Sequence, residues 1–324
     1  MKALLSRCFN GHVKGKIGLA HVFQPVLLVL QVLPVLLSLL LAAKTIAQDL
    51  EPRSYTNIPV GLGFLAVGYL YSEGELTAAP SVPLEDAELQ FDTAVLGGAY
   101  TFALAGKSAK IDALAGRMCF EGSGVFNDTL AEARRCGYVD PKFRLTWNFY
   151  GAPALAMKDY RTWEQGLVVG TSMQVSAPWG TYLDDKLINP GSNRWIIRPG
   201  IGLSNRIGSW QYEVMGSVRF FEDNHDFFGD THLEQDPLFN TQGHLIYNLA
   251  KGRWLSFNAN YFRGGQTTSN GEELDNEQSN SRFGVTFSTP LSQRYSLKIY
   301  ANTGLVTRIG NDFETLGIVL QYRL

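Results

Sequence analysis

The chain is poor in the residue types on which many enzymes and metalloproteins depend. Its 324 residues include three cysteines and five histidines, and charged residues make up only 18%. The sequence also lacks a G-x-S-x-G elbow, an H-E-x-x-H motif and a Walker loop. We therefore expect neither a catalytic site nor a cofactor.

Long hydrophobic runs are equally scarce, because only the N-terminus carries one. Residues 22–43 are apolar apart from three polar side chains, and the residues before them include four basic residues and no acid. This order is typical of a signal peptide, and Thr45 and Ala47 suit cleavage after residue 47. We expect residues 1–47 to be removed; the alternative is an uncleaved anchor helix, since the run is long enough to span a membrane.

An excess of positive charge is absent as well. Removal of residues 1–47 takes away five Lys and Arg and no carboxylate, so the net charge falls from −2 to −7. No basic surface for nucleic acid remains in bulk, and we expect no such partner. Two cysteines remain, Cys119 and Cys136; in an exported chain they favour a local disulfide, with free thiols as the alternative.

Glycine and aromatic residues, by contrast, are abundant, with 33 Gly, 14 Tyr and 19 Phe. After Asp49 there is no convincing helical stripe, but apolar and polar residues alternate almost to the last residue. In residues 142–149, for example, the odd positions are Phe143, Leu145, Trp147 and Phe149, opposite Lys142, Arg144, Thr146 and Asn148. This period of two predicts strands with one apolar face.

The strands number about twelve, and their links alternate in length. Weaker strands are expected near 57–71, 88–103, 108–119 and 165–177. Long outer links are expected at 72–87, 120–137, 178–192, 222–236, 264–280 and 305–312. The inner links are short turns, except 151–162, where a helical turn is expected. An even strand number with this asymmetry predicts an all-β fold, an antiparallel transmembrane β-barrel of the bacterial outer membrane formed by residues 48–324 as one domain.

A soluble β-sandwich or soluble barrel is the alternative explanation of the alternation. Aromatic residues gather at the ends of the apolar strand faces, as in the girdles of membrane barrels. Examples are Trp195, Trp210, Tyr212, Tyr295 and Tyr322. We therefore favour the membrane barrel.

The face opposite the apolar one carries an excess of basic residues. The alternation points these side chains into the lumen: Lys142, Arg144, Arg194, Arg198, Arg219, Arg282, Lys298 and Arg323, with Asp112, Glu213 and His244. A basic lumen favours anionic or hydrogen-bonding solutes. The alternative is that these residues pair with carboxylates and brace the wall.

The outer link 222–236 concentrates acidic residues and two histidines. Its candidate metal ligands are Asp223, Asp226 and Asp230, and His225 and His232 could form an acid–base pair with them. The alternative is a solvated loop at the cell surface, which we favour over catalysis.

Several short stretches resemble one family of exported proteins. They are residues 52–61 (PRSYTNIPVG), 150–155 (YGAPAL), 177–182 (APWGTY), 193–195 (NRW), 220–224 (FFEDN) and Gly264–Gly265. In combination, over residues 51–324, they resemble the family named for the meta-cleavage pathway of phenol degradation. The resemblance implies an outer-membrane transporter linked to aromatic catabolism, and it implies no roles for single residues.

The function expected from these features is a passive outer-membrane channel for small organic solutes, aromatic or anionic. The expected partners are outer-membrane lipid, lipopolysaccharide, the barrel-assembly machinery and the solute. The alternatives are a scaffold barrel that binds a periplasmic partner and a barrel enzyme acting on lipid or peptide.

Overall fold

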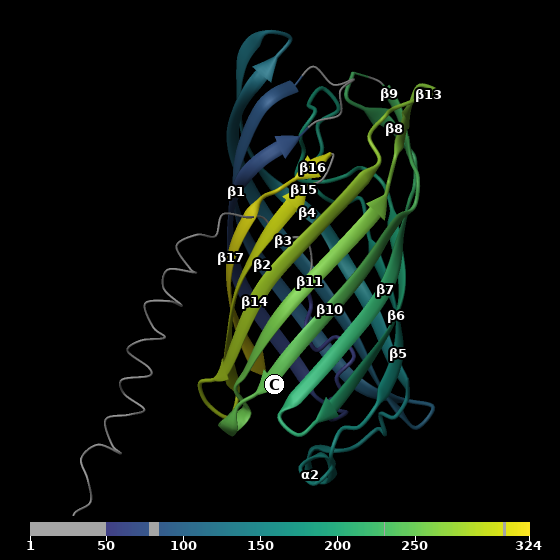
Figure 1. Ribbon diagram of the computed structural model, residues 1–324, viewed down its shortest axis with the longest axis vertical. Coiled ribbons are helices and arrows are strands. Elements are labelled where there is room, and N and C mark those ends of the chain that lie inside the picture. Colours follow the sequence, from purple (N-terminus) through teal and green to yellow (C-terminus); the bar gives the residue numbers. More distant parts are fainter. Residues whose placement is uncertain (1–49, 78–83, 230, 307–308) are drawn as a thin grey trace, which may run out of the picture. The chain divides into compact units, whose positions relative to one another are not determined.

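The computed structural model describes residues 50–77, 84–229, 231–306 and 309–324, and the expected signal peptide lies outside these residues. The described chain forms a β-barrel (Figure 1). Its strands are β1 (Gly63–Thr77), β2 (Leu84–Leu104), β3 (Lys107–Phe126), β4 (Thr129–Tyr150), β5 (Val168–Ser176), β6 (Ile196–Ile207), β7 (Trp210–Phe221), β10 (Leu238–Asn248), β11 (Trp254–Gly264), β14 (Gln278–Pro290), β15 (Tyr295–Val306) and β17 (Glu314–Arg323).

Shorter elements lie at the barrel ends. They are the helix α2 (Met157–Tyr160), the 3₁₀ turn η1 (Ala250–Gly252), and the strands β8 (Asn224–Phe227), β9 (Thr231–Gln235), β12 (Thr267–Ser269), β13 (Glu272–Glu273) and β16 (Gly310–Asn311). The helical turn expected within residues 151–162 is therefore present as α2. Among the described residues, no helix is long and apolar enough to cross a membrane.

The barrel is closed and antiparallel. Within the described residues, the twelve long strands and β16 form one 13-stranded sheet, in which β1 pairs with both β17 and β2. Each other long strand pairs with its neighbours along the chain. The predicted twelve-stranded antiparallel barrel is confirmed.

The barrel buries polar side chains in its interior and exposes apolar side chains on its outside, as expected of a barrel that is surrounded by lipid. On β10, Asn240, Gln242 and His244 are buried in the interior, whereas Phe239 and Leu245 are 59% and 43% exposed on the outside. A soluble protein buries its apolar residues instead. Lipid is the environment that this apolar outer surface requires, because apolar side chains left in contact with water are unfavourable.

The two ends of the barrel differ. One end has tight turns, η1 and α2, and it is flanked on the outside by aromatic pairs: Trp210 with Tyr247 and Tyr295 with Tyr322, whose ring centroids lie 4.7 and 5.0 Å apart. In outer-membrane barrels the short turns face the periplasm. We call this end the periplasmic end and the opposite one the extracellular end.

The first four strands extend well beyond the length needed to cross a membrane. They have 15, 21, 20 and 22 residues, whereas a tilted crossing strand needs about 9–11. The expected outer link 120–137 was therefore wrong, because β3 and β4 continue as a hairpin to a turn at Asn127 and Asp128. Most of the expected link 72–87 is also strand. A disulfide joins Cys119 and Cys136, which are directly paired across this hairpin.

The links expected at 222–236 and 264–280 contain strands of their own. There β8, β9, β12 and β13 pair into a separate four-stranded sheet at the extracellular end.

Candidate functional site

Residues 50–62 lie inside the barrel and contact the inner faces of several strands. Tyr55 is 1% exposed, and its hydroxyl lies 3.0 Å from Ser172 Oγ on β5. Its ring packs against Gly170 and Gly202, and a Cβ atom at Gly202 would come within 2.3 Å of it. Glycine at this position leaves the space that the ring occupies. The strand expected from residue 57 onward therefore begins only at β1.

Further contacts tie this segment to β7, which pairs with β6, and to β11. Thr56 Oγ1 donates a hydrogen bond of 2.9 Å to Glu213, which is itself buried on β7, and accepts one of 2.6 Å from Gln211. The Arg53 guanidinium lies 5.4 Å from the centroid of the Trp254 ring. The segment is therefore part of the packed interior.

At the periplasmic end the segment is fixed by the link between β4 and β5. The Asn57 amide donates to Gln165 at 3.3 Å, and the Tyr160 hydroxyl donates to the Asn57 carbonyl at 3.0 Å. The Val60 amide donates to the Leu155 carbonyl at 2.9 Å. Burial raises the pKa of the Tyr160 hydroxyl, which therefore stays protonated as this donor.

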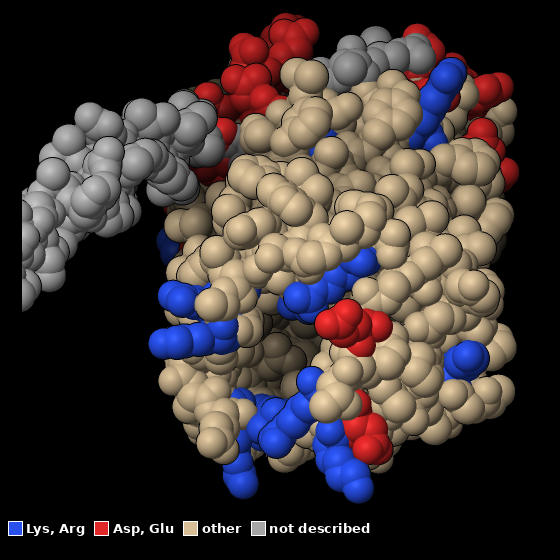
Figure 2. Space-filling model, turned by 60° about the horizontal axis from the view of Figure 1, so that its bottom comes forward, with Lys and Arg blue, Asp and Glu red and all other residues tan. Residues whose placement is uncertain are grey.

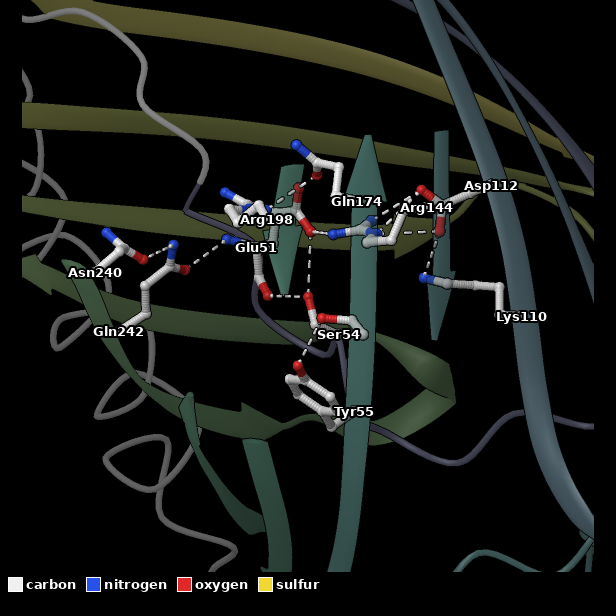
Figure 3. Close-up of polar contacts among 11 residues, drawn as sticks. Glu51, Ser54, Tyr55, Lys110, Asp112, Arg144, Gln174, Arg198, Asn240 and Gln242 are labelled. Atoms are coloured by element: carbon white, nitrogen blue, oxygen red, sulfur yellow. Dashed lines mark hydrogen bonds and ion pairs between the residues drawn. The ribbon is translucent and has the colours of Figure 1, made fainter. Parts of the chain in front are cut away.

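A charged cluster lies at mid-lumen beside the segment (Figure 3). Arg144 Nε lies 3.2 Å from both carboxylate oxygens of Asp112, and Arg144 Nη2 lies 3.0 Å from one of them. The remaining amine, Nη1, forms an ion pair with Glu51. Lys110 approaches Asp112 to 3.5 Å. The carboxylates of Asp112 and Glu51 thus face two cations of the inner wall, Arg144 and Lys110.

A cavity of about 680 Å³ adjoins this cluster. Among the described residues, its charged lining consists of five basic and two acidic residues: Arg53, Lys110, Lys142, Arg144 and Lys298, with Glu51 and Asp112. Figure 2 shows a hollow at the periplasmic end bordered by several Lys and Arg side chains and fewer acidic ones, whereas most of the visible Asp and Glu gather at the other end. The cavity has an excess of positive charge in a low-dielectric wall, where field lines are focused.

Other predicted lumen residues take part in hydrogen bonds with buried polar side chains. Arg198 is 4% exposed and donates to Gln174 at 3.1 Å. His244 Nδ1 lies 2.9 Å from Asn258 Oδ1, and His244 is paired with Glu213 across β10 and β7. Gln174 also lines the cavity, so Arg198 lies close to the charged cluster (Figure 3).

Residues 309–313 fold inward and fill part of the lumen toward its extracellular end. Arg282 is fully buried, and its two terminal amines donate to the Phe313 carbonyl at 3.3 Å and to Asn311 at 3.1 Å. The Phe313 ring lies 5.3 Å from that of Phe91, which lies 5.7 Å from that of Phe120. Together with residues 50–62, this aromatic cluster leaves a narrow lumen.

The remaining predicted lumen residues lie toward the barrel ends. Arg194 lies in the link before β6, where it contacts Gln235 and stacks 4.7 Å from the Phe221 ring; burial lowers its pKa to about 10. Arg219 lies near the extracellular end of β7, and Arg323 ends β17 at the periplasmic end.

The acidic outer link does not bring its candidate ligands together. His225 and His232 are stacked, with their Nδ1 atoms 2.9 Å apart, and Asp223 lies 3.9 Å from His232. Asp230 lies outside the described residues. Within the described part of the chain, Asp223 and Asp226 belong to no group of three or more residues able to hold a metal ion.

Alternation along the sequence identifies strand residues that face the lumen but says nothing of a segment that enters it. Glu51, Arg53 and Tyr55 precede the first strand and were not predicted to belong to the site. The sequence contained one signal of such a segment. Gly170 and Gly202 occupy inner positions of neighbouring strands, and glycine inside a strand often indicates that another part of the chain approaches the backbone closely.

Comparisons with known proteins give the same fold. An outer membrane channel from Pseudomonas putida F1 has a TM-score of 0.71 at 19% sequence identity, with 85% of this chain and 100% of that chain covered. The transport unit of the autotransporter AIDA-I from Escherichia coli has a TM-score of 0.50 at 12% identity, with 85% and 93% covered. No curated protein matches the chain. The protein is an outer-membrane β-barrel.

The family comparison agrees with the motifs found in the sequence. The family described as "Putative MetA-pathway of phenol degradation" matches residues 123–322, which cover β4 to β17 almost completely. The chain belongs to this family.

Proposed function

We propose that the protein is a passive outer-membrane channel for small organic anions, with aromatic carboxylates as the foremost candidates. The observation that carries this proposal is the excess of basic residues around the luminal cavity, five against two acidic ones. Fixed positive charge in a narrow lumen lowers the barrier for anions and raises it for cations. The channel architecture of the Pseudomonas putida F1 relative supports the same function.

The apolar lining of the cavity favours an aromatic solute. Phe64, Tyr160, Trp254 and Tyr300 line it together with the basic residues. Its volume of about 680 Å³ falls within the range of about 300–1,000 Å³ that is usual for small-molecule sites. An aromatic carboxylate can pack its ring on these side chains while its charge meets the cations. The phenol-degradation pathway in the family description is consistent with such solutes.

Transport is driven only by the solute gradient, and no cofactor takes part. The proposal includes cleavage of residues 1–47 on export, insertion by the barrel-assembly machinery and contact with lipopolysaccharide in the outer leaflet. The outer loops, chiefly 222–236 and 264–280, would set access to the mouth.

Single-channel recording with benzoate and benzyl alcohol tests this function. These solutes share the ring and differ in charge, so benzoate should reduce the chloride current at concentrations where benzyl alcohol has no effect. Lys298→Gln removes a luminal cation and should weaken the benzoate effect about tenfold, because a charge-assisted contact contributes about 1.5–3 kcal/mol. Arg263→Gln, which removes a cation from an exposed pair with Glu277, is the matched control.

Equal effects of benzoate and benzyl alcohol would contradict charge selection. A folded barrel that conducts neither chloride nor benzoate would contradict the channel itself.

A further inference from the structure

Two neighbouring turns at the periplasmic end carry exposed basic residues and no acidic ones. The turn at η1 places Lys251 and Arg253 at the surface, and the turn between β14 and β15 places Arg294 there. The two turns lie side by side, because a Cβ atom at Gly252 would come within 3.6 Å of Pro290. We call Lys251, Arg253 and Arg294 the rim patch; it belongs to the end of the barrel that comes forward in Figure 2.

The Arg294 side chain is directed to the outer surface of the barrel. Its Nη1 atom donates a hydrogen bond of 3.1 Å to the Tyr322 hydroxyl, and Tyr322 is paired with Tyr295 across β17 and β15 in the outer aromatic girdle. The neighbouring apolar side chains of Leu320 and Leu324 are 37% and 67% exposed. Aromatic girdles lie at the boundary between the hydrocarbon and the headgroups, so the guanidinium lies at the level of the headgroups.

The Arg294 guanidinium uses only part of its hydrogen-bonding capacity. Among the described residues its contact is the Tyr322 hydroxyl, and no carboxylate there forms an ion pair with it. Arg253 differs, because its Nε atom donates to the Ala250 carbonyl of its own turn at 3.2 Å. A guanidinium carries five N–H donors in a fork that matches the oxygens of a phosphate. Arg294 can therefore bind a phosphate while it stays bonded to Tyr322.

The surroundings of Arg294 favour a phospholipid with net negative charge. Lipopolysaccharide is confined to the outer leaflet, so the leaflet at the periplasmic end consists of phospholipids. A lipid phosphate reaches the guanidinium beside Tyr322 from the bilayer side, and its acyl chains then pack on the apolar outer face of the barrel. Lys251 and Arg253 add positive charge, which attracts an anionic headgroup more strongly than a zwitterionic one.

We infer that the rim patch is a binding site for an anionic phospholipid of the periplasmic leaflet, with Arg294 as the phosphate ligand and Tyr322 as the residue that positions it. This inference does not depend on which solute passes through the lumen. A bound headgroup neutralises positive charge at the periplasmic mouth. In a bilayer without anionic lipid, the charge of Arg294 contributes in full to the field at this mouth.

Native mass spectrometry of the full mature chain in detergent measures the bound lipid directly. The probes are phosphatidylglycerol, which is anionic, and phosphatidylcholine, which carries the same phosphate but no net charge. The wild type should bind phosphatidylglycerol in preference to phosphatidylcholine. Arg294→Gln should weaken phosphatidylglycerol binding about tenfold, as expected for the loss of one charge-assisted contact.

Three further variants separate a defined site from general attraction. Arg263→Gln removes an exposed cation at the extracellular end, where it pairs with Glu277, and should leave lipid binding unchanged. Arg253→Gln removes a charge of the rim patch that is held on its own turn, and it should weaken binding less than Arg294→Gln does. Tyr322→Phe keeps the ring, removes the hydroxyl that holds Arg294, and should reduce the preference for phosphatidylglycerol. The heat-dependent gel shift of each variant verifies its fold.

Equal binding of the two lipids by the wild type, or unchanged phosphatidylglycerol binding in Arg294→Gln, would overturn the inference. Equal weakening by Arg253→Gln and Arg294→Gln would replace the site by diffuse attraction of the whole rim. Unchanged binding in Tyr322→Phe would overturn the positioning role of the hydroxyl. Displacement of phosphatidylglycerol by an equal concentration of inorganic phosphate would assign the contact to free phosphate. A larger loss in Arg294→Gln than in Arg253→Gln, with no displacement by inorganic phosphate, would support the lipid site.

Discussion

At the scale of single residues, close packing between the luminal segment and the wall depends on two glycines. Gly170 and Gly202 lie where the Tyr55 ring approaches the backbone most closely. The barrel therefore has glycine at inner positions for a steric reason, and the ring in turn fills a space that water would otherwise occupy.

Gly202→Ala should displace the Tyr55 ring and destabilise the protein by about 1–3 kcal/mol, the usual cost of overpacking. Thermal unfolding followed by the gel mobility of the barrel measures this loss. Gly216→Ala is the control, because a Cβ atom there meets no heavy atom within 4 Å. Equal stability of both variants would show that the ring does not depend on this space.

At the scale of elements, the strands were predictable and the luminal segments were not. A strand between lipid and a polar lumen must alternate, so residues such as Phe143 and Arg144 reveal both the strand and its faces. Beyond the membrane this constraint ends. Glu85 and Glu88 of β2 resemble loop residues, although both pair with β3, on either side of an irregularity in the register.

The luminal segments do not alternate, because they do not lie between lipid and a polar lumen as the strands do. Residues 50–62 and 309–313 lie partly buried among the strands, and their contacts are made with residues far away in the sequence, such as Gln242 and Arg282. Several predicted basic residues, including Arg144 and Lys298, lie at the cavity, whereas Arg194 and Arg323 lie at the barrel ends. Alternation indicates which face of a strand a residue is on, but it does not indicate the residue's position along the barrel axis.

The loop that carries Phe313 should restrict conduction from the extracellular side. Phe313→Ala removes the ring that packs on Phe91 and Leu89, and we expect a larger single-channel current together with a loss of about 3–5 kcal/mol in stability. Phe283→Ala removes an equal side chain from the lipid-facing surface, where Phe283 is 50% exposed, and should leave the current unchanged. An unchanged current in Phe313→Ala would place the narrowest point elsewhere.

The extracellular hairpin of β3 and β4 should depend on its disulfide. Cys119 and Cys136 are 17 residues apart, and loss of a crosslink of this span costs about 3 kcal/mol in the chain-entropy account. Replacement of both by serine should therefore expose the hairpin tip to proteases while the membrane part of the barrel stays intact. Limited proteolysis with mass spectrometry locates the cleavage. Resistance equal to that of the wild type would mean that strand pairing alone holds the hairpin.

At the scale of the whole molecule, charge is distributed along the barrel axis. A cavity of about 1000 Å³ at the extracellular end is lined by seven carboxylates and one arginine. The periplasmic turns and links carry two acidic residues, Asp159 and Glu164, against seven basic ones: Lys107, Lys158, Arg161, Arg206, Lys251, Arg253 and Arg294. Anions are therefore attracted to one mouth and repelled at the other.

This asymmetry predicts rectification. Anions should enter more readily from the periplasmic mouth, so the anion current from the periplasmic to the extracellular side should exceed the reverse current at equal voltage. The difference should fade between 0.1 and 1 M salt, because the Debye length falls from about 10 to about 3 Å. Combined Lys107→Gln and Arg294→Gln replacement should reduce it. A symmetric current at low salt would contradict an electrostatic origin.

The most direct test of the central claim is the zero-current potential of the wild-type channel across a bilayer with a KCl gradient. A lumen controlled by Lys110, Lys142, Arg144 and Lys298 predicts a potential near that of chloride equilibrium, shifted toward zero by Lys298→Gln. A potential near that of potassium equilibrium would contradict an anion channel, whatever the identity of its organic solute.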